Sequence, residues 1–360
     1  MRKLLFIMMG LLCSMWTFGQ VNFQDIKILD ACEKAKQEKK QVFVIVYSTW
    51  YKPSLVMFEK VFTDPKVADW MNERFVSLKY DYDGGAKSDL RRLSNEYGIN
   101  TVPISFIFNA DGELENRIMI GHSEPDTWLK LLKDAMKVSL SDYAHKFNKG
   151  NRSINFLVDY LKQLLNISLY NNTTKEVSTA LFQNLTEKQR TSAQYWFMFK
   201  DATLSPVGSE YLEYVLSHFD AFCKGVGEDS VKNVISAAYK AKLCMVLALQ
   251  ERMSLDELQE IGQRLASYNL NNKEFDVFFQ LVENLLKKDW ENVLVVAENN
   301  FPTMNEISLS WAFFAVSFVY SNGDDLQKTR VLQLRDKLKA SVKNANVHSM
   351  LEGFHPEVKL

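Results

Sequence analysis

Hydrophobic positions recur with two different periods along the first 140 residues. Residues 27–39 place apolar side chains three and four positions apart, which predicts a helix with one buried stripe. Residues 41–47 are an almost unbroken run of apolar and β-branched side chains, so we expect a strand that is covered on both faces. Residues 75–81 alternate between apolar and polar side chains and predict a second strand.

The same pattern predicts the remaining elements of this region. Helical spacing continues over 51–62, restarts at Asp64-Pro65, and returns around Leu90, Leu93 and Tyr97. Two more strands are expected over 101–108 and 114–120, joined by a hairpin turn at Asn109-Ala110-Asp111-Gly112. A last helix follows Ser123, with Pro125 near its start. The resulting order is helix, strand, helix, strand, helix, strand, strand, helix.

From about Ser141 the pattern becomes helical throughout. Prolines are sparse, and three segments have the form of a capping box, beginning at Thr186, Ser254 and Thr303. We expect an all-helical domain over 141–345 with eight to ten helices, followed by a loose tail over 346–360. The length suits stacked helical hairpins of the tetratricopeptide kind, although no fixed period of about 34 residues is present.

The segment Trp50-Tyr51-Lys52-Pro53-Ser54 stands between the first strand and the following helix. It resembles the active-site loop of thioredoxins, Trp-Cys-x-Pro-Cys, with both cysteines replaced. Thr101-Val102-Pro103 resembles the cis-proline loop that faces the active site in that family. Together with the order of elements, these segments resemble the thioredoxin-like superfamily over residues 22–140, and Phe62-Thr63-Asp64-Pro65-Lys66-Val67 is similar to a bacterial exported subgroup.

The resemblance implies an α/β thioredoxin-like domain over 20–140, but the residues argue against its usual chemistry. Thiol–disulfide exchange needs a thiolate that attacks a disulfide sulfur. Tyr51 and Ser54 cannot do this, and Ile45 stands where thioredoxins carry a buried acid. A serine nucleophile would need a base, and the five histidines of the chain are scattered. We therefore expect a redox-inactive domain and assign no catalytic residue.

The groove of the family can still bind a ligand without thiols. In that family the backbone before the cis-proline pairs with an extended substrate strand, which is a form of β-augmentation. The resemblance therefore implies a peptide or protein ligand held by the two loops. The candidate binding residues are Trp50, Tyr51, Lys52, Pro53, Ser54, Val102 and Pro103.

Two alternatives remain open from the sequence. The first is a thiol–disulfide oxidoreductase, which would require Cys32, Cys223 or Cys244 near the groove. The second is a purely structural domain whose groove is filled by the protein itself. Cys223 and Cys244 are expected on neighbouring helices, so they either form a disulfide or remain two free thiols.

The N-terminal end has the features of an export signal over 1–19. Arg2 and Lys3 precede an apolar stretch, and the small residues Thr17 and Gly19 suit cleavage after Gly19. We expect an exported, periplasmic protein without an integral membrane segment after signal removal; the alternatives are a lipid anchor at Cys13, an uncleaved membrane anchor, or an extracellular location.

Charge and motifs exclude several classes of ligand. The net charge is −1, so no overall field attracts nucleic acid. The sequence contains no phosphate-binding loop, zinc-ligand cluster, dinucleotide fingerprint or calcium loop. We therefore expect neither a cofactor nor a metal ion.

Overall fold

The computed structural model describes residues 19–84, 88–119, 121, 124–270 and 272–354. The expected signal segment over 1–19 and the predicted cap Ser123 therefore lie outside the described residues, apart from Gly19. The chain divides into two compact units, the first ending at Leu185 and the second beginning at Thr186. Among the described residues, no helix is both long and apolar enough to cross a membrane.

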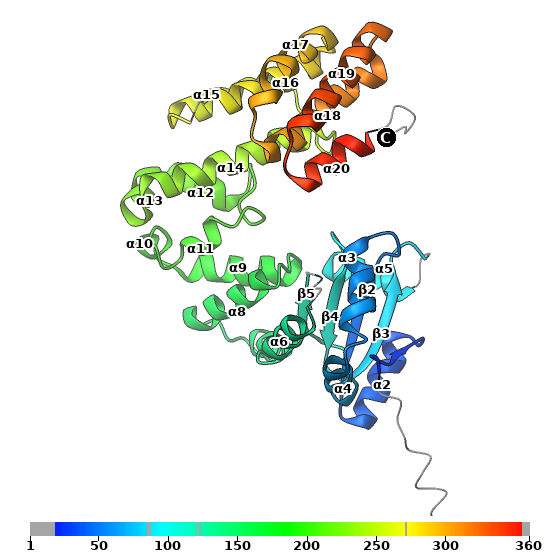
Figure 1. The fold of residues 1–360 in the computed structure, drawn as a ribbon. Helices are drawn as coiled ribbons and strands as arrows, with labels where there is room; N and C mark the ends of the chain where they lie inside the picture. The colour runs from blue at the N-terminus through cyan, green and yellow to red at the C-terminus, as the bar shows by residue number, and fades with distance from the viewer. Residues whose placement is uncertain (1–18, 85–87, 120, 122–123, 271, 355–360) are drawn as a thin grey trace, which may run out of the picture. The chain divides into compact units, whose positions relative to one another are not determined.

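The first unit is built on a mixed sheet of five strands (Figure 1). β2 is the central strand and pairs parallel with β3 and antiparallel with β4. The edge strands are β1, which has two residues, and β5. In the order β1-β3-β2-β4-β5 the strands are β1 (Phe23–Gln24), β3 (Phe75–Asp81), β2 (Gln41–Tyr47), β4 (Ile104–Phe108) and β5 (Leu114–Ile118).

Helices cover both faces of this sheet, which explains why β2 is an unbroken apolar run. Phe43 and Ile45 of β2 belong to a fully buried cluster with Trp128 and the helices of one face. The first face carries α3 (Lys52–Val56), the π-turn η1 (Met57–Val61), α4 (Pro65–Arg74) and α6 (Pro125–Ala135); the second carries α2 (Ile28–Glu38) and α5 (Ser88–Tyr97).

The helix expected over 51–62 differs from the prediction in its second half. After α3 the backbone widens to a π-turn, in which the Phe62 amide donates to the Met57 carbonyl five residues earlier (2.9 Å). The next helix, α4, starts as predicted, because the Asp64 side chain accepts from the amides of Lys66 and Val67 and Pro65 occupies the first turn.

Three further helices belong to the first unit: α7 (Leu140–Asn148) packs against β5, α8 (Ile154–Asn166) packs against α7, and α9 (Asn172–Asn184) packs against α8. Two side chains of β5 reach them. The Glu115 carboxylate accepts from the Ser141 hydroxyl (2.6 Å), and the buried Arg117 guanidinium donates to the carbonyls of Ser168 (2.6 Å) and Gly98 (2.9 Å). The structure becomes helical near the predicted boundary of 140, but this unit continues to Leu185.

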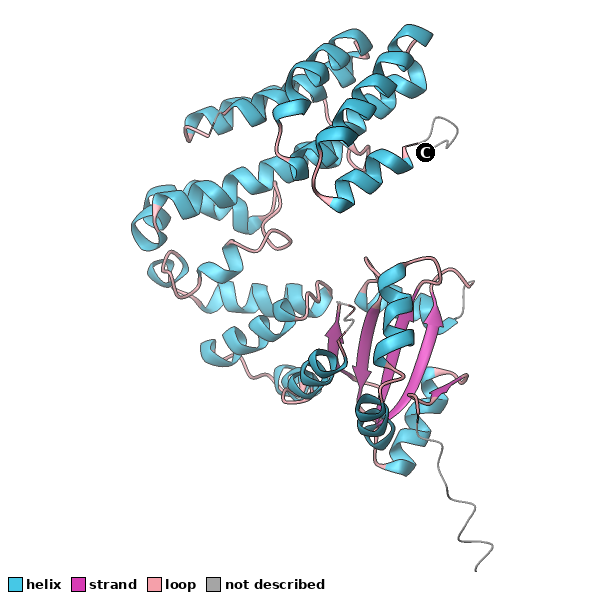
Figure 2. Cartoon of the chain, viewed as in Figure 1, coloured by secondary structure: helices cyan, strands magenta, loops and turns pink. Residues whose placement is uncertain are grey.

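The second unit is helical in all its described elements (Figure 2). Helices that follow one another along the chain pack in pairs, among them α16 with α17 and α18 with α19. The elements are α10 (Glu187–Arg190), α11 (Trp196–Phe199), α12 (Glu210–Ser217), α13 (Phe219–Val226), α14 (Glu228–Leu247), α15 (Leu255–Ser267), α16 (Lys273–Lys287), α17 (Trp290–Asn300), the 3-10 turn η2 (Phe301–Thr303), α18 (Glu306–Asn322), α19 (Asp325–Ser341) and α20 (Ala345–Gly353).

The helix-start signals of this region are only partly correct. Thr186 and Ser254 form the predicted capping boxes of α10 and α15. The third prediction is wrong, because Asn305 rather than Thr303 caps α18 and accepts from the amides of Ile307 and Ser308. From α7 to α19 the described residues contain thirteen α-helices, where eight to ten of ordinary length are expected; α10 and α11, with four residues each, are too short to show a period.

The expected loose tail is also wrong over its first part. Asn344 accepts from the amides of Asn346 and Val347 and starts α20, whose Val347 and Leu351 are buried. The Phe354 ring then packs edge-on against Phe313 of α18. Residues 355–360 lie outside the described part of the chain.

Candidate functional site

The predicted active-site-like loop lies between β2 and α3. Tyr51 is the residue before the helix, with an extended backbone, and its carbonyl accepts from the amides of Ser54 (2.9 Å) and Leu55 (3.3 Å). Pro53 stands in the first turn, where its missing N–H costs nothing. Trp50 and Tyr51 are exposed, and their rings meet edge-to-face with centroids 5.9 Å apart.

Ser54 points the other way and is fully buried. Its hydroxyl oxygen accepts from the Ser48 amide (3.3 Å), while the buried Ser48 hydroxyl donates to the Asp83 carboxylate (2.5 Å). The buried side chain of Ser54 therefore stabilises the loop through its hydrogen bond with the Ser48 amide. Of the five loop residues, Trp50, Tyr51, Lys52 and Pro53 lie at the surface and Ser54 does not.

The second predicted loop lies beside the first. Val102–Pro103 is a cis peptide bond, with Pro103 buried and Val102 half-buried. Val46 of β2 pairs with Ile104 of β4, so Pro103 stands next to the residues that open the first loop. A methyl group on Gly121 would lie 2.7 Å from the Pro103 ring and 3.3 Å from the Met57 sulfur. Gly121 thus lets the cis-proline loop pack against the helix that begins at Lys52.

A third loop completes this end of the sheet and is absent from the sequence prediction. β3 runs parallel to β2, so the residues after both strands meet at the same edge. The Tyr82 amide donates to the Tyr47 carbonyl (2.8 Å), and Asp83 holds Ser48 as described above. Tyr82 is 47% exposed and adds a third aromatic side chain to this end. The parallel pairing of the two strands is the signal that could have found it.

Cys32, the described thiol of the first unit, lies far from these loops. A methyl group on Gly112 would be 3.6 Å from its sulfur, and Gly112 belongs to the hairpin turn after β4. β4 begins at the candidate site and ends at that turn, five residues or about 16 Å away. Burial raises the pKa of Cys32, which disfavours the thiolate needed for exchange.

The remaining described cysteines lie in the second unit. Cys223 on α13 and Cys244 on α14 are free thiols in this structure. Burial raises the pKa of Cys223 and raises the pKa of Cys244 to about 11. Ile45, at the position where the family resemblance implies a buried acid, is fully buried among apolar side chains.

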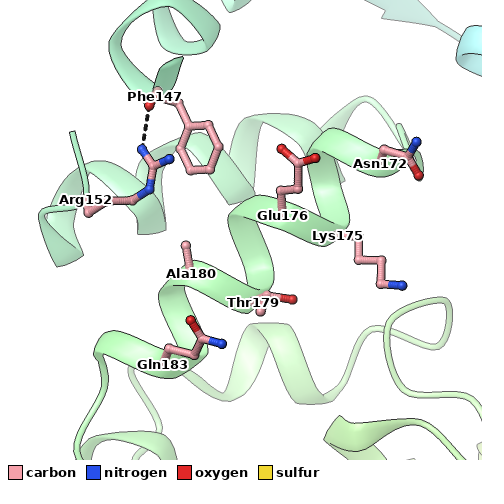
Figure 3. Close-up of a pocket in the computed structure, with 8 residues that line it drawn as sticks. All are labelled: Phe147, Arg152, Asn172, Lys175, Glu176, Thr179, Ala180 and Gln183. Carbon is pink, nitrogen blue, oxygen red and sulfur yellow. Dashed lines mark hydrogen bonds between the residues drawn. The ribbon is translucent and has the colours of Figure 1, made fainter. Parts of the chain in front are cut away.

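A separate hollow of about 480 Å³ lies between the end of α7, the segment before α8, and α9 (Figure 3). One side is a stripe of α9 that runs from Asn172 to Gln183. On the other side the Arg152 guanidinium lies 3.6 Å from the centre of the Phe147 ring and donates to the Phe147 carbonyl (2.5 Å). Within the described residues, no group of three or more histidine, cysteine, aspartate or glutamate side chains could hold a metal ion.

Comparison with known proteins identifies the part of the chain that carries the loops. Residues 29–136 match the family model of a thioredoxin-like domain. These residues form a thioredoxin-like domain. The match covers under a third of the chain, and α7–α9 and the second unit lie outside it. No curated protein sequence is similar enough to count as a match.

Two solved structures are similar to about a third of this chain. One is the solution structure of a candidate disulphide-isomerase from Bacteroides thetaiotaomicron, with 29% identity and a TM-score of 0.30. The other is an oxidoreductase named DsbH, with 15% identity and a TM-score of 0.29. Both matches cover 34% of this chain, and they cover 97% and 91% of the two solved chains.

Proposed function

We propose that the thioredoxin-like domain binds an extended peptide or protein segment and does not exchange disulfides. One observation carries this proposal. At the helix start, Trp50 is 73% exposed and Tyr51 is exposed, whereas Ser54 is fully buried. A protein seldom leaves an indole in water, and tryptophan and tyrosine are the side chains most often found at the centre of binding surfaces.

The positions of the thiols support the redox-inactive part of the proposal. Cys32 lies at the opposite end of β4, and its pKa is raised by burial. Tyr51 and Ser54 carry no sulfur, and the Ser54 hydroxyl is occupied by the Ser48 amide. In the family, the groove binds substrate through backbone atoms beside the cis-proline, so Val102 would pair with the ligand while Trp50, Tyr51 and Pro103 contact its side chains.

We infer that this function is carried out in the cell envelope. The support is the signal-like segment over 1–19 and the resemblance to exported thioredoxin-like proteins. Thiol–disulfide exchange remains the second candidate, because the matched family includes proteins with that chemistry. A groove filled by the protein itself remains the third.

Binding is tested by selecting peptides from a random library on residues 20–360. The selected peptides are then measured against Trp50→Ala and against Leu29→Ala, which truncates a similarly exposed side chain on α2. We expect about tenfold weaker binding to the Trp50 variant and no change for the Leu29 variant. Equal binding to both variants would contradict the proposal.

Amide exchange separates a binding groove from an internally filled one. Relative to the free protein, a selected peptide should slow amide exchange at Trp50, Tyr51, Lys52, Thr101 and Val102; Pro53 and Pro103 have no amide, and the Ser54 amide already donates to the Tyr51 carbonyl. If these loops are already protected without peptide, and peptide adds nothing, the groove is filled by the chain and the binding proposal is wrong.

A further inference from the structure

The exposed aromatic side chains of the thioredoxin-like domain gather at one end of its sheet. Trp50 and Tyr51 follow β2, and Tyr82 follows the parallel neighbour β3. Tyr82 lies outside the two loops that the family resemblance implicates, so its exposure is not explained by the proposed groove alone.

Several hydrogen bonds fix residues 81–84 around Tyr82, including one from the Gly84 amide to the Asp81 carbonyl (3.3 Å). The Tyr82 amide donates to the Tyr47 carbonyl, and the Ser48 hydroxyl donates to the Asp83 carboxylate (2.5 Å). The Asp83 amide donates to the Asp81 carboxylate (3.1 Å). These bonds hold the loop before any ligand arrives, which lowers the entropy lost on binding.

The charge around Tyr82 differs from the charge around Tyr51. In the sequence Asp81 and Asp83 stand on either side of Tyr82, and their carboxylates accept from the Asp83 amide and the Ser48 hydroxyl; Lys52 follows Tyr51. An exposed phenol ring attracts a cation through its face, and adjacent carboxylates add to this attraction. A negatively charged side chain of a ligand would be repelled beside Tyr82, whereas Lys52 would repel a positively charged one beside Tyr51.

We propose that Tyr82, Asp81 and Asp83 form a subsite for a lysine or arginine side chain of the bound peptide. This inference rests on the proposed function and adds the class of peptide to it. The ligand would be an extended segment whose apolar side chains contact Trp50 and Tyr51 and whose basic side chain lies on Tyr82.

The test uses an array of 13-residue peptides that tile reduced, carboxymethylated α-lactalbumin. Each peptide is printed in three forms, with its lysines and arginines kept, changed to glutamine, or changed to glutamate. We expect the full chain to bind the basic forms about fivefold more strongly than the glutamine forms, and the glutamate forms least.

Variants assign this preference to the subsite. Tyr82→Ala, and separately Asp81→Asn with Asp83→Asn, should reduce the ratio of basic to glutamine forms to about one while binding of the glutamine forms persists. Tyr170→Ala and Asp126→Asn alter an exposed tyrosine and an exposed aspartate elsewhere in the first unit and should leave the ratio unchanged.

The outcomes distinguish this inference from the function beneath it. If all three forms bind equally and Trp50→Ala weakens all of them, the basic subsite is wrong and the peptide groove stands. If no peptide binds, both proposals fail. If maltohexaose quenches the fluorescence of the parent but not of Trp50→Ala, and no peptide of the array binds, the aromatic side chains bind a saccharide and the inference is overturned.

Discussion

Trp50, Tyr51 and Ser54 show how single side chains decide what this domain can do. The helix start that stabilises a thiolate in thioredoxins is present, since Tyr51 precedes α3 and its carbonyl receives the first amides. A phenol and a buried hydroxyl stand in place of the two sulfurs, so that positive end has no thiol to activate. What remains at the surface is aromatic area, which suits binding.

Gly121 offers a test of how closely the cis-proline loop is packed. In Gly121→Ala the new methyl group would meet the Pro103 ring at 2.7 Å, a distance that requires one of them to move. We expect the free energy of unfolding to fall by about 1–3 kcal/mol. If the proposed function is correct, selected peptides should also bind more weakly, because Pro103 borders the proposed groove. Urea denaturation and peptide titration measure the two effects.

Gly262→Ala is the matched control for this change. Gly262 lies within α15, where an added methyl group has only ordinary contact with Phe279 at 3.7 Å. Replacing a glycine inside a helix should be neutral or should stabilise by up to about 1 kcal/mol. A Gly121 variant as stable as this control would show that Pro103 is not held as described.

At the scale of elements, the helices after residue 140 are joined to the sheet by buried polar groups. The Arg117 side chain is buried and bonds to carbonyls of two separate segments, at Gly98 and Ser168. Asn171 adds a bond from its side-chain amide to the Glu96 carbonyl (3.3 Å). These contacts explain why the compact unit extends past the thioredoxin-like domain to Leu185.

Arg117→Ala should therefore destabilise the first unit strongly. The change leaves two carbonyls without their donor and opens a space beside β5. We expect a loss of about 2–4 kcal/mol, measured by urea denaturation. Arg91→Ala, which alters an exposed arginine on α5, should change stability by less than about 0.5 kcal/mol. Similar values for both variants would contradict the structural role of Arg117.

The three helices α14, α16 and α18 of the second unit share one polar cluster. The Lys240 ammonium donates to the Glu274 carboxylate and to the Ser308 hydroxyl (both 2.7 Å), and Ser308 also donates to Glu274. Burial alone would raise the pKa of Glu274, but the hydrogen bonds from Lys240 and Ser308 outweigh it and lower that pKa.

This cluster predicts a pH-dependent contribution to stability. Because the pKa of Glu274 is lower in the folded protein, its contribution is present above the unfolded pKa of about 4.3 and is lost as the pH falls below it. Glu274→Gln should cost about 1 kcal/mol at pH 7, a value discounted for partial exposure. The difference between parent and variant should shrink at pH 3.5. A difference that is the same at both values would contradict the prediction.

For the whole molecule, the sequence predicts the fold class because each signal is local. The apolar run of β2, the alternation of β3 and the Asp64-Pro65 helix start depend on residues a few positions apart, and the structure confirms them. The predicted α/β domain followed by a helical region is also confirmed.

The rest depends on contacts between residues distant in sequence. Tyr82 joins the candidate site only because β3 lies beside β2, and the end of the first unit depends on Arg117 meeting Ser168. Burial of Ser54 depends on which side of a short helix faces the sheet. The loop residues proposed from the sequence stay a prediction as a binding site until a ligand is measured.

Reduction of insulin by the mature protein tests the central claim, beside the double variant Tyr51→Cys/Ser54→Cys. We expect the parent not to reduce insulin, because no thiol lies at the helix start. We expect the double variant to reduce it, because the helix start and the cis-proline loop are in place. Insulin reduction by the parent would contradict the account and would make Cys32, Cys223 and Cys244 the residues to mutate next.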